Sequence, residues 1–218
     1  MSKVGFCLLT NVDGYDEQKL FETIKKYHAL PHESKMRMAP KHHNGSNSNI
    51  YHGYFPFLEG DASHKEFLDL GRSIDDISEW EKNGCPLYEA NPWVKGESED
   101  IRETFENHYK VMHSLALTLI RCLALGLGKK AEFFDPWFKD ECSSTLRGIH
   151  YMPRSEASLS KLSEEQKKLV TPEHTDSGFI TLLSTFEYPG LQVLIGDEYM
   201  DIKPAPNSIV VNIGDTLE

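Results

Sequence analysis

Hydrophobic side chains recur at helical spacing in two stretches of the first two thirds of the chain. The shorter stretch predicts a helix that begins near Asp16 and ends before Pro31. The longer one predicts a helix between Ser98, a candidate N-cap, and the glycines at 126 and 128. Because its apolar stripe runs along the whole helix, we expect it to support a large core. The stripe consists of Ile101, Phe105, Tyr109, Met112, Ala116, Leu119 and Leu123.

Short apolar or alternating runs between turn-forming residues predict β-strands. One run, Val4 to Thr10, precedes the first helix, and the stretch 41–57 is predicted to be a loop. A polar, partly helical insertion at 154–170 interrupts a second group of runs. That group is typical of a β-barrel or sandwich and reads STLRGIHYM, GFITLLSTF, GLQVLIG, EYMDIKP and NSIVVNIGD. We therefore expect a helical support region at 1–145 and a sheet-rich region at 146–218.

Charge and composition exclude several classes of protein. The 218 residues include 34 acidic and 23 basic ones, for a net charge of −11, and the basic residues do not cluster. Such a chain repels phosphate backbones and anionic membranes, so we expect neither a nucleic acid nor a membrane as partner. No apolar stretch of about 20 residues and no signal-peptide pattern occurs. The four widely spaced cysteines favour reduced thiols, and we expect a cytoplasmic protein.

The segment PEHTDSGFITLL contains a candidate metal-binding pair, His174 and Asp176. A carboxylate two positions after a histidine is weak evidence, since His64 and Glu66 have the same spacing. Residues i and i+2 share one face of a strand but diverge on a helix. GDASHKEFLDL reads as the start of a helix, so we interpret His64 and Glu66 as surface residues. His174 and Asp176 precede a β-branched run and are predicted to project together from a strand.

One imidazole and one carboxylate do not fill the coordination sphere of a first-row divalent metal ion. The arrangement that uses both residue types is the facial triad of two histidines and one carboxylate, which leaves positions open on Fe(II). Those positions can take a 2-oxo acid and O₂, so the pair indicates oxidative chemistry if a third ligand joins it. The protein then holds the ligands, orients the substrate and excludes water.

A series of motifs around this pair resembles the 2-oxoglutarate/Fe(II)-dependent oxygenase superfamily. In order they are HTDSG, GLQV, the Pro-Ala-Pro turn and VNIGD, and they follow one another from 174 to 215. The resemblance is to the branch that includes isopenicillin N synthase and the plant flavonoid, gibberellin and ethylene-forming enzymes. GFCLLTNVDG, LPHESKM, NPWV and LRGIHYMPR are similar to earlier segments of the family. The fold that this implies is a double-stranded β-helix, the cupin-like jelly roll, within an α+β, mainly β protein.

The resemblance also implies a set of site residues and cofactors. His174 and Asp176 match the first two iron ligands, with Fe(II), 2-oxoglutarate and O₂ as the reactants at the metal. Tyr151 matches a position that often contacts 2-oxoglutarate, although it is equally interpreted as a tyrosine of the barrel wall. Asn212 matches a position that lines the cofactor pocket. The implied enzyme is a non-haem iron dioxygenase that hydroxylates, desaturates or cyclises a small organic molecule, whose identity does not follow from the sequence.

The family pattern stops before its second histidine ligand and before the R-x-S pair that anchors 2-oxoglutarate. We therefore expect a jelly roll that is incomplete at its C-terminus, in a chain that is part of a longer oxygenase or that a partner chain completes. The alternative is a catalytically inactive scaffold or interaction protein on the same fold. A cupin-like isomerase is a further alternative, as is a relative of isopenicillin N synthase that uses iron and O₂ without 2-oxoglutarate.

Overall fold

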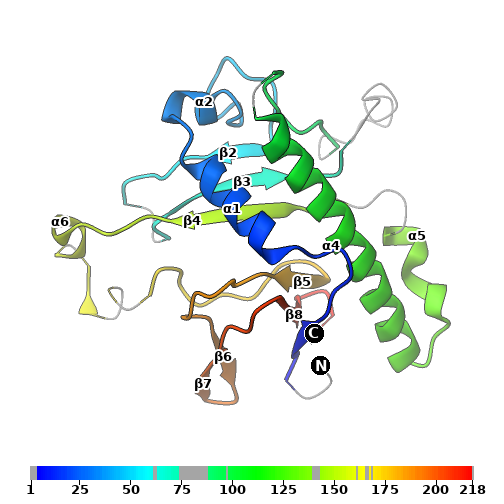
Figure 1. Cartoon of the computed structure of the whole chain (residues 1–218). Coiled ribbons are helices and arrows are strands. Elements are labelled where there is room, and N and C mark those ends of the chain that lie inside the picture. Colours follow the sequence, from blue (N-terminus) through cyan, green and yellow to red (C-terminus); the bar gives the residue numbers. More distant parts are fainter. Residues whose placement is uncertain are drawn as a thin grey trace. The chain divides into compact units, whose positions relative to one another are not determined.

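In this computed structural model the described residues are 4–60, 63–73, 88–96, 98–138, 143–160, 162–164, 167 and 169–217. The chain divides into two compact units. Unit 1 comprises Met1–Glu22, Asn107–Cys142 and His174–Glu218, and unit 2 comprises Thr23–Glu106 and Ser143–Glu173. The elements are β1 (Phe6–Thr10), α1 (Glu17–His28), α2 (His32–Met36), β2 (Gly53–Phe55), β3 (Lys65–Leu70), α4 (Glu99–Gly126), η1 (Ala131–Phe134), α5 (Asp135–Phe138), β4 (Leu146–Tyr151), α6 (Glu156–Leu159), β5 (Ile180–Leu183), β6 (Gln192–Ile195), β7 (Glu198–Asp201) and β8 (Ser208–Ile213) (Figure 1).

Unit 1 is organised around strand β8. It pairs antiparallel with β1 on one side and with β5 on the other, which gives the order β1-β8-β5. A central strand with apolar side chains on both faces reads as a continuous hydrophobic run, and residues 208–212 of β8 are all buried. Ile209 and Val211 form a core with Met112 of α4. Strands β6 and β7 form a separate two-stranded hairpin.

Unit 2 contains the sheet β2-β3-β4, which is antiparallel throughout. Its core joins the sheet to residues from the end of α1 and the beginning of α4. Gly148 of β4 allows this close packing, because a Cβ there would lie 3.3 Å from the ring of Phe105. The buried members of the core are Tyr27, Met38, Ala39, Tyr54, Leu68, Leu70, Ile101 and Phe105.

The end of helix α4 follows the predicted glycine signal. Gly128 has a φ of 71°, the left-handed conformation that favours glycine. The N–H of Lys129 donates to the carbonyl of Ala124, and the N–H of Gly128 donates to that of Leu125. These two hydrogen bonds make a Schellman motif, which satisfies carbonyls that the end of a helix leaves unpaired.

Most predicted elements are present, and two local predictions are wrong. Both predicted helices occur, as does a strand within each predicted run, and the insertion contains the short helix α6. The segment 65–70, predicted to begin a helix, is the strand β3, and the predicted loop at 41–57 contains the strand β2. Each compact unit combines segments from before and after residue 145. The predicted division at 145 therefore does not coincide with the boundaries of these units and stays a prediction.

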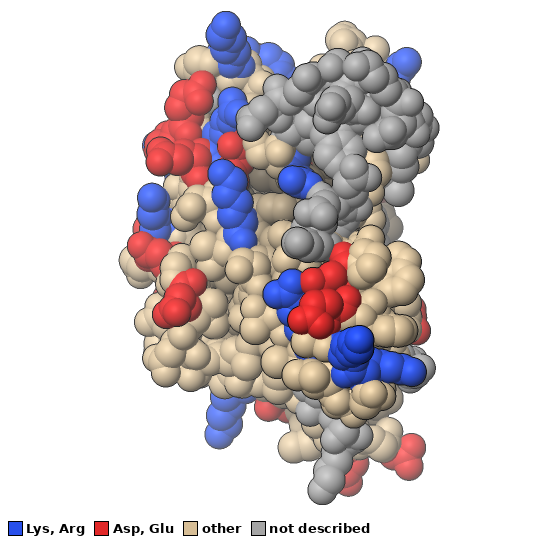
Figure 2. All heavy atoms as spheres, turned by 90° about the vertical axis from the view of Figure 1, so that its right-hand side faces the viewer, with Lys and Arg blue, Asp and Glu red and all other residues tan. Residues whose placement is uncertain are grey.

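Three findings bear on the predictions from charge and composition: the distribution of surface charge, the state of the cysteines, and the helices that could cross a membrane. Lysine and arginine are interspersed with acidic residues on the face shown in Figure 2. Cys7 and Cys122 are free thiols, and Cys122 is exposed rather than buried, while Cys85 and Cys142 lie outside the described residues. Within the described part of the chain no single helix is long and apolar enough to cross a membrane. Helix α4 with the following segment to Phe138 meets that test by length and composition only as a pair bent by 118°.

Candidate metal centre

His174 and Asp176 lie side by side in unit 1. The Nε2 atom of His174 is 3.6 Å from Oδ1 of Asp176, and the side chains are 62% and 31% exposed. The segment that carries them is irregular, since β5 begins only at Ile180. The prediction that both residues lie on a strand is therefore wrong. Their side chains nevertheless converge, as two ligands of one ion require.

Backbone hydrogen bonds hold this irregular segment against the chain that follows β8. The N–H groups of 214–216 donate to carbonyls within 176–179, at 2.9 to 3.0 Å. Gly214 makes this approach sterically feasible. A Cβ at Gly214 would lie 2.6 Å from the carbonyl oxygen of Gly178 and 2.9 Å from that of Asp176. The glycine of the VNIGD segment thus fixes the backbone of the candidate ligand, a role that the sequence analysis did not identify.

Two side chains hold the carboxylate of Asp176 from the sheet side. The buried Nδ2 of Asn212 donates to Oδ2 at 2.8 Å, and Thr181 also donates a side-chain hydrogen bond. Thr181 on β5 is paired directly with Asn212 on β8, so both side chains leave the same face of the sheet. Burial alone would raise the pKa of Asp176, but these two hydrogen bonds and the nearby His174 lower it below its ordinary value.

This geometry places one oxygen of the carboxylate beside an imidazole nitrogen. Oδ2 is held by Asn212, whereas Oδ1 faces Nε2 of His174. An ionised carboxylate oxygen and a neutral imidazole nitrogen are both ligands that Fe(II) accepts. The pair therefore fits as part of an iron site. Within the described residues, no third histidine, cysteine or carboxylate joins it in a three-ligand set.

The structure places the two predicted cofactor residues in different units. Asn212 lies in unit 1 and supports Asp176 directly. Tyr151 lies in unit 2 at the end of β4, where it is 46% exposed and its hydroxyl accepts a hydrogen bond from Thr171 at 3.3 Å. Contact with 2-oxoglutarate stays a prediction for both residues.

A second group of histidines and a carboxylate lies in unit 2, around Glu66 of β3. We call it the Glu66 cluster, and it consists of Glu66, His28, Lys35, Tyr54 and His150. The two Nδ1 atoms lie 3.1 Å (His28) and 2.9 Å (His150) from Oε1 of Glu66. The ammonium of Lys35 contacts both carboxylate oxygens, and the hydroxyl of Tyr54 donates to Oε2 at 2.5 Å. The interpretation of Glu66 as a surface residue is wrong, since its side chain is only 6% exposed.

The charge of Glu66 persists in this buried place because of its donors. Burial alone would raise the pKa of the Glu66 carboxyl, but hydrogen bonds from the four other members of the cluster hold it well below its ordinary value. A buried carboxylate is destabilising unless it is paired and hydrogen-bonded. The Glu66 cluster meets that condition with side chains from α1, α2, β2 and β4.

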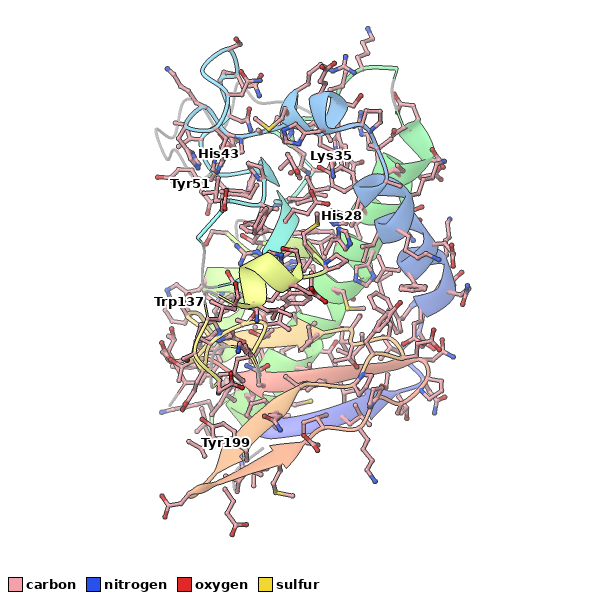
Figure 3. The ribbon with its side chains drawn as sticks, turned by 90° about the vertical axis from the view of Figure 1, so that its left-hand side faces the viewer. His28, Lys35, His43, Tyr51, Trp137 and Tyr199 are labelled. Carbon is pink, nitrogen blue, oxygen red and sulfur yellow. The ribbon has the colours of Figure 1, made fainter. Side chains whose placement is uncertain are left out.

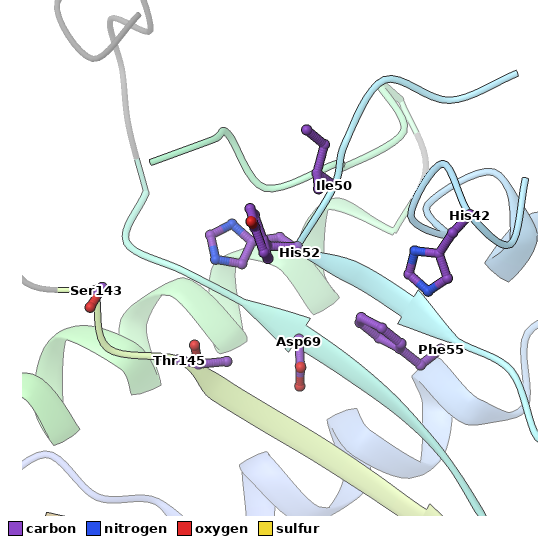
Figure 4. A pocket seen from close by; sticks show the side chains of 8 residues that line it. His42, Ile50, His52, Phe55, Asp69, Ser143 and Thr145 are labelled. Atoms are coloured by element: carbon purple, nitrogen blue, oxygen red, sulfur yellow. The ribbon is translucent and has the colours of Figure 1, made fainter. Parts of the chain in front are cut away.

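The opposite face of the same sheet carries a hollow with a volume of about 540 Å³. Phe55 of β2 and Asp69 of β3 line it together with His42, His52 and Thr145 (Figure 4). Asp69 is not free to bind a cation there, because Arg147 holds both of its oxygens at 2.7 Å. All lining residues belong to unit 2, so the hollow is separate from the pair in unit 1.

The chain is similar to known proteins over nearly its whole length. Residues 142–218 match the 2OG-Fe(II) oxygenase superfamily. An isopenicillin N synthase from Amycolatopsis lactamdurans is 30% identical over 216 residues, which are 98% of this chain and 66% of that protein. The 2-oxoglutarate-Fe(II) type oxidoreductase hxnY from Emericella nidulans is 32% identical over 205 residues, 91% of this chain and 57% of that protein. The chain thus spans less than two thirds of the length of either relative.

Solved structures show the same fold. A full-length protein from Neurospora crassa, crystallised in complex with alpha-KG and 5-formyluracil, superimposes with a TM-score of 0.76 at 27% identity. The match covers 98% of this chain and 63% of that one. The likeness confirms the predicted fold class, an α+β architecture with the antiparallel sheets of the jelly-roll oxygenases.

Proposed function

Because this chain belongs to the 2OG-Fe(II) oxygenase superfamily, we propose that it takes part in an Fe(II)- and 2-oxoglutarate-dependent oxidation of a small organic molecule by O₂. The reaction class is hydroxylation, desaturation or ring closure. The relatives support both the iron and the cosubstrate, and the N. crassa structures contain alpha-KG. Since the chain spans 66% of the first relative, the activity of the whole protein is a proposal.

One observation carries the proposal: Nε2 of His174 and Oδ1 of Asp176 lie 3.6 Å apart. In this role His174 offers Nε2 and Asp176 offers Oδ1 to the iron. Iron bound there would supply the activation of O₂ that the protein's own side chains cannot perform. A third protein ligand is needed to complete a facial triad.

The neighbouring side chains prepare the carboxylate for this role. Asn212 donates to Oδ2 of Asp176 and Thr181 donates a further side-chain hydrogen bond, so the two side chains fix the direction of the carboxylate. Hydrogen-bonded neighbours of metal ligands typically change metal affinity or activity by about 10- to 100-fold when they are removed. The lowered pKa of Asp176 keeps its carboxylate ionised near neutral pH. Asn212 is thus a positioning residue in this proposal.

The small size of the substrate is supported by the molecules named with the similar proteins. The N. crassa structures contain 5-formyluracil or thymine, and a gibberellin 20 oxidase from Arabidopsis thaliana is 28% identical over 99% of this chain. The pyrimidines in those structures and the gibberellin in the name of the plant relative differ widely in shape. They support a small organic molecule and do not favour one compound for this protein.

Anaerobic titration with Fe(II), followed by 2-oxoglutarate, tests the proposal. We expect a weak visible charge-transfer band and, after O₂ is admitted, formation of succinate. Asp176→Ala should abolish both while the protein stays folded, because this carboxylate serves the metal more than the core. Asp197→Ala, at an exposed turn position, is the matched control and should behave as the unchanged protein.

The same experiment separates the alternatives. Absence of Fe(II) binding by the folded protein would refute the proposal and favour an inactive scaffold. Oxygen consumption without succinate would instead indicate iron chemistry of the kind that does not use 2-oxoglutarate. Retention of succinate formation in Asp176→Ala would show that this residue is not a ligand.

A further inference from the structure

The Glu66 cluster contains the donor set of a metal site apart from the His174 and Asp176 motif. His28, Glu66 and His150 each offer a ligand atom, and these atoms all lie within 4.8 Å of one another. Two imidazoles and one carboxylate are the ligand types that bind Zn²⁺, Co²⁺ and Fe²⁺. The cluster lies within unit 2, where His28 stands at the end of α1 and Lys35 on α2 (Figure 3).

The surroundings of His28 are those of a metal-binding histidine. Its Nδ1 faces Oε1 of Glu66 at 3.1 Å, while its Nε2 lies 3.3 Å from the carbonyl oxygen of Gly148. A carbonyl can only accept, so Nε2 carries a proton. Nδ1 is then the ring nitrogen that faces the cluster and that would bind a metal ion. Metal-ligating histidines commonly donate their other N–H to a carbonyl in this way.

Lys35 supplies the positive charge in the middle of this set. Its ammonium lies 3.0 Å and 2.8 Å from the two oxygens of Glu66 and 2.9 Å from the carbonyl oxygen of His28. These three acceptors satisfy the three donors of an ammonium group. Its side chain is only 7% exposed, so water does little to screen the charge.

We propose that Lys35 takes the place of a metal ion in a latent second site and keeps divalent ions out of it. A dication bound to the two Nδ1 atoms and Oε1 would lie beside a buried ammonium with little solvent between them. The repulsion opposes binding, and the carboxylate would have to give up its contact with Lys35. Removal of the ammonium leaves the same ligands around a less compensated carboxylate, which favours a divalent ion.

The consequence is selectivity within one protein. Among the described residues, the pair of His174 and Asp176 and the Glu66 cluster both offer histidine and carboxylate ligands, and the lysine would confine metal binding to the pair. The inference concerns unit 2 alone and goes beyond the proposed oxygenase function.

The test removes the first set so that only the second is measured. In His174→Ala/Asp176→Ala protein, Co²⁺ binding is followed by equilibrium dialysis and by the visible absorption of bound Co²⁺. We expect Lys35→Met to bind one equivalent at least about 10-fold more tightly than the Lys35 parent. Adding His150→Ala to Lys35→Met should remove this gain. Lys41→Met, an exposed lysine of unit 2, is the matched control and should leave binding as in the parent.

Any of three results would overturn the proposal. Lys35→Met with no gain, or with a gain that persists in His150→Ala, shows that the cluster is not the site. A Lys35 parent that already binds Co²⁺ through His150 shows that the lysine does not exclude metal. If Lys35→Met proves unstable, Co²⁺ should raise its melting temperature by mass action, and failure to do so also refutes the proposal. Loss of iron binding at His174 and Asp176 would not affect this test.

Discussion

The pair in unit 1 and the Glu66 cluster in unit 2 use the same residue types in opposite ways. His174 is 62% exposed and Asp176 31%, and the carboxylate of Asp176 accepts from two side chains, Asn212 and Thr181. Glu66 is 6% exposed and accepts from four side chains. A partly exposed carboxylate beside an exposed imidazole suits an exchangeable partner, whereas a buried carboxylate with four donors suits a fixed structure. Burial and donor count, not residue type, therefore separate a binding site from a structural network.

The comparison also shows where each set contributes to stability. The Glu66 cluster joins α1, α2, β2, β3 and β4 through one carboxylate, so its loss should affect the folding of unit 2. The pair in unit 1 stands outside the regular strands and depends on backbone contacts with 214–216. Changes there should affect ligand geometry more than folding.

Glu66→Ala should give the largest effect, because it leaves a buried ammonium and three further donors without their acceptor. Breaking a buried ion pair by removing one partner typically lowers the free energy of unfolding by about 3–5 kcal/mol. We expect a loss in that range by urea denaturation. Glu103→Ala, on an exposed position of α4, is the control and should change the free energy of unfolding by less than about 0.5 kcal/mol. A similar small change in Glu66→Ala would show that the cluster does not stabilise unit 2.

The error at Glu66 shows why sequence alone could not find this cluster. In HKEFLDL the charged Glu66 shares its strand face with the buried Leu68 and Leu70, and a charge at such a position favours the interpretation as the start of a helix. The partners of Glu66 are 12, 31, 38 and 84 positions away along the chain. Local pattern does predict the two long helices and most of the other strands, because their signals repeat within each element. A polar residue that distant partners compensate gives no local signal.

The candidate metal site was predicted only in part, because its motifs are local in the sequence whereas the residues that support it are distant. The motif series identifies His174 and Asp176, and the structure brings them together. The motifs do not reveal that this segment is irregular, since its backbone is set by the close approach of Gly214. Asn212 was expected to contact the cofactor, yet its observed contact is with Asp176, 36 positions away. Sequence therefore located the residues, while their support depends on pairing between β5 and β8.

Gly214→Ala should have the next largest effect, because it tests the backbone that holds Asp176. The added methyl group would meet the carbonyl oxygens of Gly178 and Asp176 at 2.6 and 2.9 Å, and backbone cannot move as a flexible side chain does. Overpacking of this kind typically costs about 1–3 kcal/mol. We expect such a loss in urea denaturation, together with weaker Fe(II) binding. Gly45→Ala is the control, since a Cβ there meets nothing within 4 Å and should be tolerated. Equal stability of the two variants would contradict the inferred close approach.

Asn212→Ala and Thr181→Val should give the smallest effect, a rise in the pKa of Asp176. In the folded protein hydrogen bonds from both side chains lower this pKa, so the ionised carboxylate stabilises the fold above the ordinary pKa and the contribution is lost as pH falls through the lowered one. Removing either donor should move the titration toward higher pH, measured by carboxyl ¹³C NMR. Ser208→Ala is the control, because it alters a buried hydroxyl of the same strand that donates to Ala205 instead. If neither variant moves the titration while Ser208→Ala also leaves it unchanged, then Asn212 and Thr181 do not lower the pKa of Asp176. The comparison between Asp176, held by two donors, and Glu66, held by four, would then have no support from unit 1.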